Sequence, residues 1–530
     1  MSNELAVKII KEYEGCVSDR TNWDSYWRNI AQYVIPFKDD VYQVNQEGQR
    51  KGHDIYDGTA ILANETLASA LHSMLTNPSI PWFGLSTGIP DIDARDDVRK
   101  FFQNTTRVMH NIFNDSNFQT EIHEVYLDLG SFGTGLMLIE EDDDSIIRFR
   151  SSPVYVSHIK ENSKGVVDTV YRKYQLTVQQ IFDTYGKEAF PSSMSIESIL
   201  KEPGKKMDVV HAVFPRNQRL YGVVTPKNMP WASVHILKEY KTILKESGYT
   251  SFPYVTPRWT KLSNELYGRS PAMKALPDIQ MLNKMMKVTI RGAEKIVDPP
   301  IMAPDDGMSL PIKLTAGGVN YYRAGTPDRI EQMDIKARPD VGLDMIEAVR
   351  ASVRSFFFID QLQLSEGPQM TATEVMQRTE EKLRLLAPIL GRQHNELLKP
   401  LVERCFDIIG RKKLIPTAPE ILRDRNIKVQ YSSMIARSQK TAEVDNLNRF
   451  FAIAAPILQV DQTVVDNFDS DEAFRYAATM YNLPQELLRD SSDVDTLREE
   501  RATQAQAAQQ RMQEQHTAEV INKTGANNVQ

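Results

Sequence analysis

The segment from Pro271 to Asp360 constrains the fold of this chain more than any other part of the sequence. Its first part, residues 271–298, repeats apolar and basic side chains at helical spacing. On a helical wheel the apolar residues gather on one side, at Ile279, Leu282, Met285, Met286, Ile290, Ala293, Ile296 and Val297. Four basic residues form a band on the other side, the basic stripe: Lys284, Lys287, Arg291 and Lys295. The pattern predicts a helix with one packed face and one basic face.

This helix is expected to end at Asp298-Pro299-Pro300, because proline lacks a backbone donor and disfavours helical geometry in the residue before it. After about forty residues of turn formers and β-type segments, the helical period returns in residues 341–360. At 1.5 Å per residue the first helix would be roughly 40 Å long. Two such helices would carry the segment between them away from the rest of the protein. A single pair of helices cannot cover both of its own apolar faces. The pattern favours repeated copies packed in a ring closed by head-to-tail contacts.

The composition is that of a folded protein with several domains. A chain of 530 residues with 41% apolar and 25% charged side chains predicts about two to four domains. No run of 18 apolar residues occurs, and the N-terminus lacks the order of a signal peptide, so we expect a soluble protein made in a cytoplasm. Cys16 and Cys405 lack partners at metal-site spacing and are interpreted as buried small side chains. The net charge of −7 argues against a protein that coats nucleic acid with its whole surface, but it permits a local basic lining.

Residues 1–270 have an α+β pattern. Helical spacing runs from Leu5 to Val34, with an aromatic-rich core face, and Asp57 is expected to cap a helix that ends near Leu75. Two more helices are expected in residues 98–130, and one in 178–185 that ends at Gly186. Alternating side chains then predict strands in residues 146–150, 154–156, 166–174, 207–214, 232–240 and 253–255.

Two stretches in this region, RTNWDSYWRNIAQYVIPF and IYDGTAILANETLASALHSMLTNPSIPWFGLS, form a compound pattern of about sixty residues. The pattern resembles the N-terminal signature of portal proteins, the head-to-tail connectors of T-seven-like short-tailed phages. The resemblance continues at GSFGTGLMLIEE, at LTVQQIFDTYG and through residues 370–410.

The resemblance implies a predominantly helical α+β portal fold with wing, stem, clip and crown, assembled into a closed ring of twelve. The implied parts are a wing (1–270), a first stem helix (271–298), a clip (299–340), a second stem helix (341–360), a tunnel loop (361–370), a wing return with a long kinked helix (371–430), a helical crown (431–497) and a Gln/Ala-rich, partly disordered tail (498–530). Local signals agree in part, since Thr371 and Glu374 form a capping box and residues 427–431 suggest a strand that returns to the wing.

The resemblance also implies a virion protein at one capsid vertex, assembled in the host cytoplasm. Double-stranded DNA would pass through its ring without sequence readout, during packaging and again during ejection. The implied partners are the terminase large subunit, the scaffold and major capsid proteins, the internal core proteins and the tail adaptor. No cofactor and no membrane insertion are expected.

Two interpretations of the basic stripe are open. It could be a solvated face, or one paired with acids of a neighbouring subunit. Alternatively it could meet DNA phosphates, because lysine is a flexible point charge that suits a sliding duplex.

Two further sets of candidate residues rest on the resemblance. The tunnel loop, which could also be a plain connector, would meet DNA through Ser365, Glu366, Gly367 and Gln369. The clip would dock the packaging motor and later the tail through residues of mixed charge, Asp305, Asp306, Asp328, Arg329, Glu331 and Arg338.

No catalytic residue and no metal site is predicted. The glycine-rich run 130–135 lacks the Lys-Ser/Thr ending of a phosphate loop and precedes a strand, so a tight structural turn is favoured. The acidic run 140–144 could hold a divalent cation, but it has the position of a solvated hairpin tip. The competing functions are a metal-dependent DNA-processing enzyme, such as a nuclease, and a ring-shaped tail adaptor.

Overall fold

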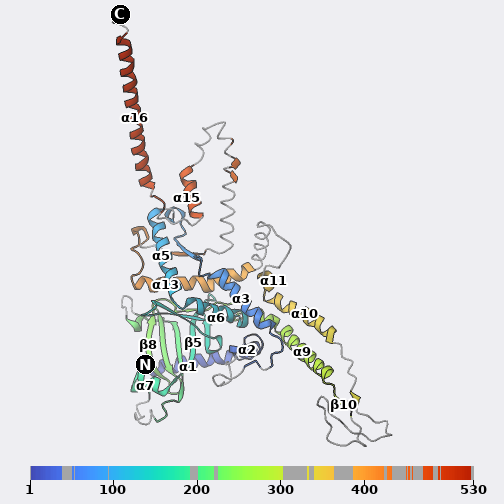
Figure 1. Ribbon diagram of the computed structural model, residues 1–530. Helices are drawn as coiled ribbons and strands as arrows, with labels where there is room; N and C mark the ends of the chain where they lie inside the picture. The colour runs from blue at the N-terminus through green and yellow to red at the C-terminus, as the bar shows by residue number, and fades with distance from the viewer. Residues whose placement is uncertain are drawn as a thin grey trace. The chain divides into compact units, whose positions relative to one another are not determined.

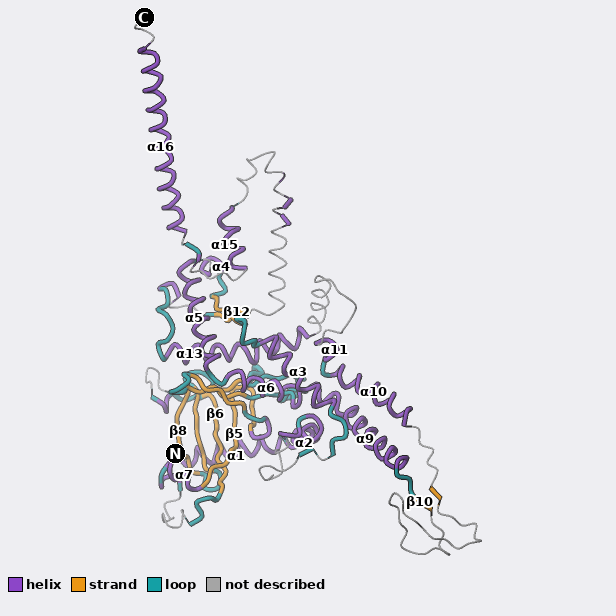
Figure 2. The backbone as a smooth tube through the Cα atoms, in the orientation of Figure 1, coloured by secondary structure: helices purple, strands orange, loops and turns teal. Residues whose placement is uncertain are grey.

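The computed structural model describes the chain except for residues 1, 39–50, 53, 94, 191–200, 220–224, 303–330, 333–338, 363–385, 423–426, 432–448, 451, 454–455, 457–468, 481–486, 490 and 527–530. The chain forms two compact units. The first contains Met1–Ile80 and Asn111–Lys412, and the second contains Pro81–His110 and Lys413–Gln530. Both units contain helices and strands (Figures 1 and 2). Every helix among the described residues is too short or too polar to span a bilayer.

The N-terminal segment forms two helices, α1 (Ser2–Asp19) and α2 (Thr21–Val34), so the prediction of one continuous helix is wrong. The break lies at Arg20, whose side chain is buried. Its guanidinium donates to the carbonyl oxygens of Val154, Tyr155 and Ser157 at 2.6–2.9 Å. These contacts turn residues 154–156 into a short 3₁₀ helix, η2 (Val154–Val156), where a strand was predicted. The expected aromatic core face of α2 is confirmed, since Trp27, Ile30 and Val34 are buried.

A five-stranded antiparallel sheet forms the largest layer of the first unit. Its strands follow the order β4 (Ser157–Glu161), β5 (Val167–Thr177), β6 (Lys206–Pro215), β7 (Trp231–Leu237) and β8 (Thr242–Tyr249). Neighbouring residues of a strand face opposite sides of the sheet. The helix α1 packs on the side that carries Val210 and Val234 (Figure 1). The helix α7 (Val178–Tyr185) packs on the side of Val209 and has the predicted bounds.

A second sheet has the strand order β3 (Ile147–Ser151), β2 (Met137–Glu141), β9 (Tyr254–Val255). Glu140 and Glu141 of the acidic run end β2, and Asp142, Asp143 and Asp144 lie in the turn to β3, so the run occupies a hairpin tip as predicted. Within it, the Ser145 hydroxyl donates to Asp142 at 2.8 Å, and Glu141 pairs with Arg411. The remaining helices of this region are η1 (Pro36–Lys38), α3 (Thr59–Leu75), α6 (Phe118–Phe132), η3 (Lys187–Ala189) and η4 (Pro226–Asn228). The N-cap of α3 is Gly58, one residue after Asp57, which was the predicted cap. The Asp57 carboxylate nevertheless accepts a hydrogen bond from the Thr59 amide.

The glycine-rich run ends α6 and leads into β2. Gly133 caps the helix in the left-handed conformation, with φ of 76°. A Cβ at this residue would lie 2.4 Å from the carbonyl oxygen of Gly268, and one at Gly268 would lie 2.1 Å from that of Gly133. A Cβ at Gly135 would lie 2.7 Å from Val125. The glycines therefore allow two backbone segments to touch, which confirms the prediction of a structural turn.

The last part of the first unit begins at Pro271 and ends at Lys412. It contains α9 (Pro271–Val297), β10 (Ile301–Met302), β11 (Glu331–Gln332), α10 (Pro339–Phe356), α11 (Ile359–Leu362), helical residues 386–393, the π-helix η5 (His394–Leu398) and α13 (Lys399–Arg411). The second stem helix ends earlier than predicted, because Phe358 adopts the left-handed conformation with φ of 62°.

The second unit contains β1 (Phe83–Ser86), α4 (Pro90–Asp93), most of α5 (Asp96–Asp115), η6 (Glu420–Leu422), β12 (Lys428–Tyr431), α15 (Ser470–Met480) and α16 (Ser491–Ala526). β1 and β12 pair antiparallel, with Phe83 opposite Tyr431. Arg498 at the start of α16 pairs with Asp471 of α15 at 2.5 Å. The Gln/Ala-rich segment, expected to be a helix that fades into disorder, is helical as far as Ala526 in α16.

Two stacked histidines lie inside the first unit, between the two sheets. The rings of His211 on β6 and His235 on β7 are 4.1 Å apart and almost parallel. Nε2 of His211 lies 2.9 Å from the Ser233 hydroxyl, and Nδ1 of His235 lies 3.0 Å from the Tyr174 hydroxyl. Burial, reinforced by the charges of Lys245 and Arg172, lowers the pKa of His235 to about 4. Burial also lowers the pKa of His211 well below its ordinary value.

This stack predicts loss of stability in mild acid. The folded protein holds these imidazoles neutral, whereas the unfolded chain protonates them near pH 6.5, so their contribution to stability is present above pH 6.5 and falls as the pH approaches 4. For His235 the loss should reach about 3 kcal/mol. Unfolding midpoints measured from pH 7.5 to 4.5 should therefore fall less steeply for His235→Gln, which does not titrate. Equal slopes for both proteins would contradict this assignment.

Candidate nucleic-acid interface

The helices α9 and α10, expected from the resemblance to be the two stem helices, run side by side away from the sheets (Figure 1). Near the body they pack through Ile279 and Leu282 of α9 and Ile346 of α10, which are buried. The Ser352 hydroxyl also donates to the Asp278 carboxylate at 2.8 Å. Toward the far end of α9 the apolar side chains become exposed, with Ile290 at 38%, Ile296 at 43% and Val297 at 86%. The predicted packed face is thus covered only in its first half by the described residues.

The beginning of α9 is fixed by contacts to distant elements. Ser270 caps the helix by accepting from the Met273 amide at 3.0 Å, and its hydroxyl donates to the Ser131 carbonyl at 2.7 Å. Pro277 lies inside the helix and has no N–H to donate to the carbonyl of Met273 four residues earlier. The Tyr26 hydroxyl donates to that carbonyl instead, at 2.8 Å. A side chain of α2 therefore replaces the hydrogen bond that proline removes.

Tyr26→Phe is expected to destabilise the protein by about 1–2 kcal/mol, because it leaves a helix carbonyl beside Pro277 without a donor. Combining it with Pro277→Ala should recover part of this loss, since alanine restores the backbone donor. Denaturant unfolding of the unchanged protein, Tyr26→Phe and the double variant measures both effects. A Tyr26→Phe variant as stable as the unchanged protein would show that water satisfies this carbonyl.

The four cations of the basic stripe are not equivalent. Lys284, Arg291 and Lys295 are exposed. Lys287 is half-buried, and its ammonium lies 5.0 Å from the ring centroid of Tyr56. Within the described residues, none of the four forms an ion pair with an acidic side chain. Three of them are therefore available to an outside anion in the single chain.

The other predicted contact residues are described only in part. The tunnel-loop candidates Ser365, Glu366, Gly367 and Gln369 lie outside the described residues, as do the clip candidates Asp305, Asp306, Asp328, Arg329 and Arg338. Glu331 lies in β11, where its backbone pairs with Met302 in an antiparallel ladder. This short ladder joins the two chain segments beyond the stem helices.

The structure adds a contact that sequence reasoning missed, a strap formed by Asp54–Asp57. On α9, the Asn283 side chain donates to the Asp54 carbonyl at 2.7 Å and accepts from the Tyr56 amide at 2.6 Å. On α10, Arg350 donates twice to one carboxylate oxygen of Asp57, at 2.9 and 2.7 Å. The only signal in the sequence was a polar residue, Asn283, beside the apolar face of a predicted helix.

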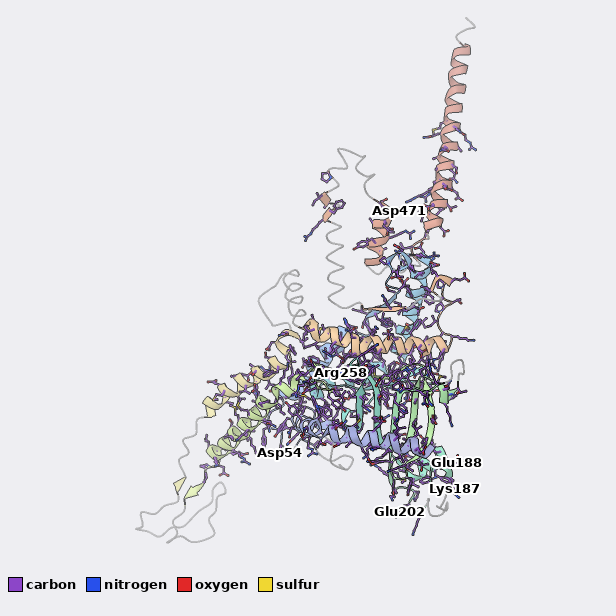
Figure 3. All side chains as sticks on the ribbon, turned by 180° about the vertical axis from the view of Figure 1, so that it is seen from behind. Asp54, Lys187, Glu188, Glu202, Arg258 and Asp471 are labelled. Atoms are coloured by element: carbon purple, nitrogen blue, oxygen red, sulfur yellow. The ribbon has the colours of Figure 1, made fainter. Side chains whose placement is uncertain are left out.

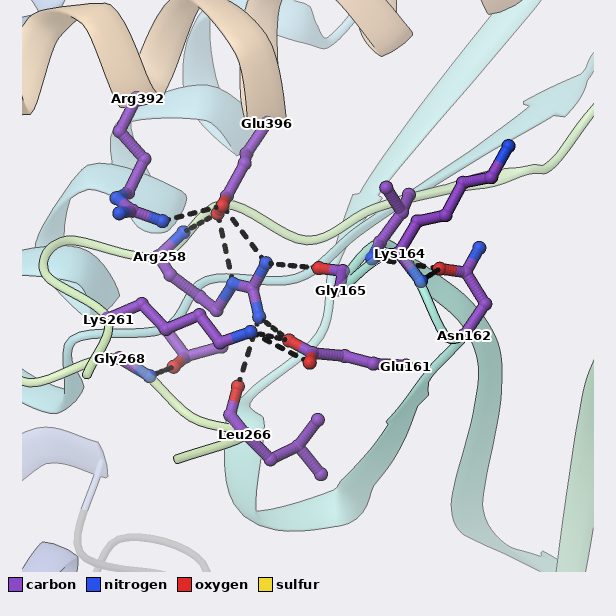
Figure 4. A network of polar contacts seen from close by, with 12 residues as sticks. Glu161, Asn162, Lys164, Gly165, Arg258, Lys261, Leu266, Gly268, Arg392 and Glu396 are labelled. Atoms are coloured by element: carbon purple, nitrogen blue, oxygen red, sulfur yellow. Dashed lines mark hydrogen bonds and ion pairs between the residues drawn. The ribbon is translucent and has the colours of Figure 1, made fainter. Parts of the chain in front are cut away.

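A buried network surrounds Arg258, which lies inside the first unit between η5 and β4 (Figures 3 and 4). Its side chain is 3% exposed and pairs with Glu161 of β4 and with Glu396 of η5. The guanidinium also donates to the carbonyls of Leu266 and Gly165 at 3.2 and 3.3 Å. Burial alone would lower its pKa, but the two carboxylates raise it, so the charge is retained. The network fixes the segment that leads into α9.

The described residues include no group of three or more His, Cys, Asp or Glu side chains that could hold a metal ion.

Comparison with known proteins gives matches over almost the whole chain. Residues 6–488 match the family described as bacteriophage head to tail connecting protein. The chain is 32% identical over 508 residues to the probable portal protein of Bordetella phage BPP-1, which covers 93% of this chain and 90% of that protein. It is 29% identical over 514 residues to the portal protein of Salmonella phage epsilon15, with coverage of 95% and 92%. Similarity to the portal protein of Enterobacteria phage T3 is lower, 18% over 459 residues, with coverage of 84% and 82%.

Proposed function

The chain belongs to the bacteriophage head-to-tail connecting protein family, and from this membership we propose that it acts as the portal subunit of a closed ring of twelve copies. The resemblance read from its N-terminal motifs is thereby confirmed. The family is structural, and within this proposal the chain forms a passage for DNA. The ring would sit at one capsid vertex and pass double-stranded DNA inward during packaging and outward at infection.

The exposed apolar end of α9 supports ring assembly. Ile290 and Val297 line a cavity of about 670 Å³ together with Ala293 and three polar residues, Glu294, Lys295 and Asp298. Exposed apolar side chains along a projecting helix are costly in water, and a neighbouring copy would cover them. Sedimentation equilibrium of the purified chain, followed by negative-stain imaging, tests this point. A stable monomer would contradict it.

The basic stripe supports a channel lining. Exposed cations repeated around a ring would form circles of mobile positive charge, which attract phosphates without fixing a register or reading bases. Within this proposal the parts retain the roles implied by the resemblance. The tunnel loop predicted at 361–370 would begin after Leu362, because Gln361 and Leu362 belong to α11, and its other residues lie outside the described ones. The clip would dock first the terminase and then the tail adaptor. Scaffold, capsid and internal core proteins contact the rest of the ring.

Reversing two stripe charges tests the lining. Lys284→Glu combined with Arg291→Glu should lower the amount of DNA packaged by about tenfold, because each ring then repels phosphates at two levels. Rings should still form, as judged by negative-stain imaging. Lys274→Glu is the matched control, since Lys274 is exposed on the same helix but outside the stripe. Normal packaging by the double variant would make the stripe a structural or solvated face.

A further inference from the structure

We propose that the strap Asp54–Asp57 sets the angle between the two stem helices, and that Lys287 belongs to this strap and does not meet DNA. The proposal rests on the proposed function, since it divides the four cations of the channel lining into two roles. It begins from the fact that one four-residue segment binds both α9 and α10.

The hold on α9 is directional. Asn283 is 9% exposed, and its amide donates to one peptide group of the strap and accepts from another. A side-chain amide that pairs in this way fixes both the position and the chain direction of the strap. If the strap left, the amide would lose both partners in a largely buried position, which is costly. Asn283 therefore favours one position of the strap along α9.

The hold on α10 uses a buried charge. The Asp57 side chain is 3% exposed, and the Arg350 side chain is 27% exposed. Burial would raise the pKa of Asp57, but hydrogen bonds from Thr59 and Arg350 outweigh it and lower the pKa. The carboxylate thus joins the first turn of α3 to α10. Movement of α10 away from the strap would leave this charge buried without its arginine, so the contact resists a change of angle.

Lys287 completes the strap from the α9 side. Its ammonium lies over the Tyr56 ring, whereas Lys284, Arg291 and Lys295 are exposed. A cation held on an aromatic face is stabilised there and loses the mobility that suits a sliding contact. Lys287 is therefore a positioning residue, and the three exposed cations are the ones left to meet phosphates.

Lysine acylation, followed by mass spectrometry of the full-length protein, tests the contact directly. In Tyr56→Ala the Nζ of Lys287 should react about fivefold faster than in the unchanged protein, because its cover is gone. Tyr56→Phe keeps the ring and should leave the rate unchanged. A rate at Lys287 that does not differ between the unchanged protein and Tyr56→Ala would overturn the strap assignment, whatever the outcome of any packaging assay.

Hydrogen exchange combined with packaging separates the two roles. Lys287→Met and Asp57→Asn should speed amide exchange in α9 and α10 severalfold, whereas Lys284→Met should leave exchange unchanged and lower DNA retention. If Lys287→Met and Lys284→Met reduced packaging equally without changing exchange, Lys287 would be a DNA-facing cation, and the proposal would fail while the portal function stood. Normal packaging by Lys284→Glu combined with Arg291→Glu would contradict the assignment of the stripe as a channel lining. Amide hydrogen exchange would still decide whether the strap sets the angle between α9 and α10.

Discussion

Gly133→Ala should prevent stable folding of the first unit. A Cβ at this residue would lie 2.4 Å from the Gly268 carbonyl oxygen, 2.7 Å from the Ser270 nitrogen and 2.8 Å from the Arg269 carbonyl carbon. All three atoms belong to backbone, so no side chain can rotate away. The positive φ of 76° adds a further cost for alanine. We expect a loss of at least about 4 kcal/mol, seen as insoluble expression or a large fall in the unfolding midpoint.

Two other glycines provide matched controls. Gly186 has φ of 72° and ψ of −170°, a region that is almost restricted to glycine, and nothing lies within 4 Å of its Cβ position. Gly186→Ala therefore measures a conformational cost without a backbone clash, about 1–3 kcal/mol. Gly15 lies in α1 with open space around it, and Gly15→Ala should stabilise the helix by up to about 1 kcal/mol. A Gly133→Ala variant no less stable than Gly186→Ala would show that the two backbone segments can separate without cost.

Arg258→Met should cost about 3 kcal/mol of unfolding free energy. The substitution keeps the length of the side chain but removes the partner of two carboxylates, Glu161 and Glu396, and the donor to two carbonyls. Removing one partner of a buried charge network leaves the other charges without compensation. Lys261 and Arg392, which pair with Glu161 and Glu396 at the edge of the network, limit the loss. Denaturant unfolding of the purified protein measures it.

The control for this prediction is an exposed arginine on the same segment. Arg269 pairs with Glu265 and is 41% exposed, so Arg269→Met should cost less than about 1 kcal/mol. Adding Glu161→Gln and Glu396→Gln to Arg258→Met should recover part of the stability, because no carboxylate is then buried without its arginine. The recovery is partial, since Lys261 and Arg392 lose their carboxylate partners. A similar loss for Arg258→Met and Arg269→Met would mean that water reaches the Arg258 site.

Element positions that depend on local spacing were predicted well. The first stem helix was expected at 271–298 and spans Pro271–Val297, and the helix expected at 178–185 has those bounds. The errors lie where a distant side chain acts on the backbone. Arg20 breaks the first helix and bends residues 154–156, at separations of more than 130 residues. No local pattern encodes such a contact, because the partners meet only after the sheet has formed.

The sequence by itself determined three features: the basic stripe, the segment of turn formers between two long helices, and the membership of a family. Each is a pattern of residue types along the chain. Only the tertiary structure decided how the four stripe cations differ. Tyr56 and Lys287 are separated by more than 200 residues, and so are Asp57 and Arg350. Helical periodicity places a side chain on a face, but the path of the whole chain decides what covers that face.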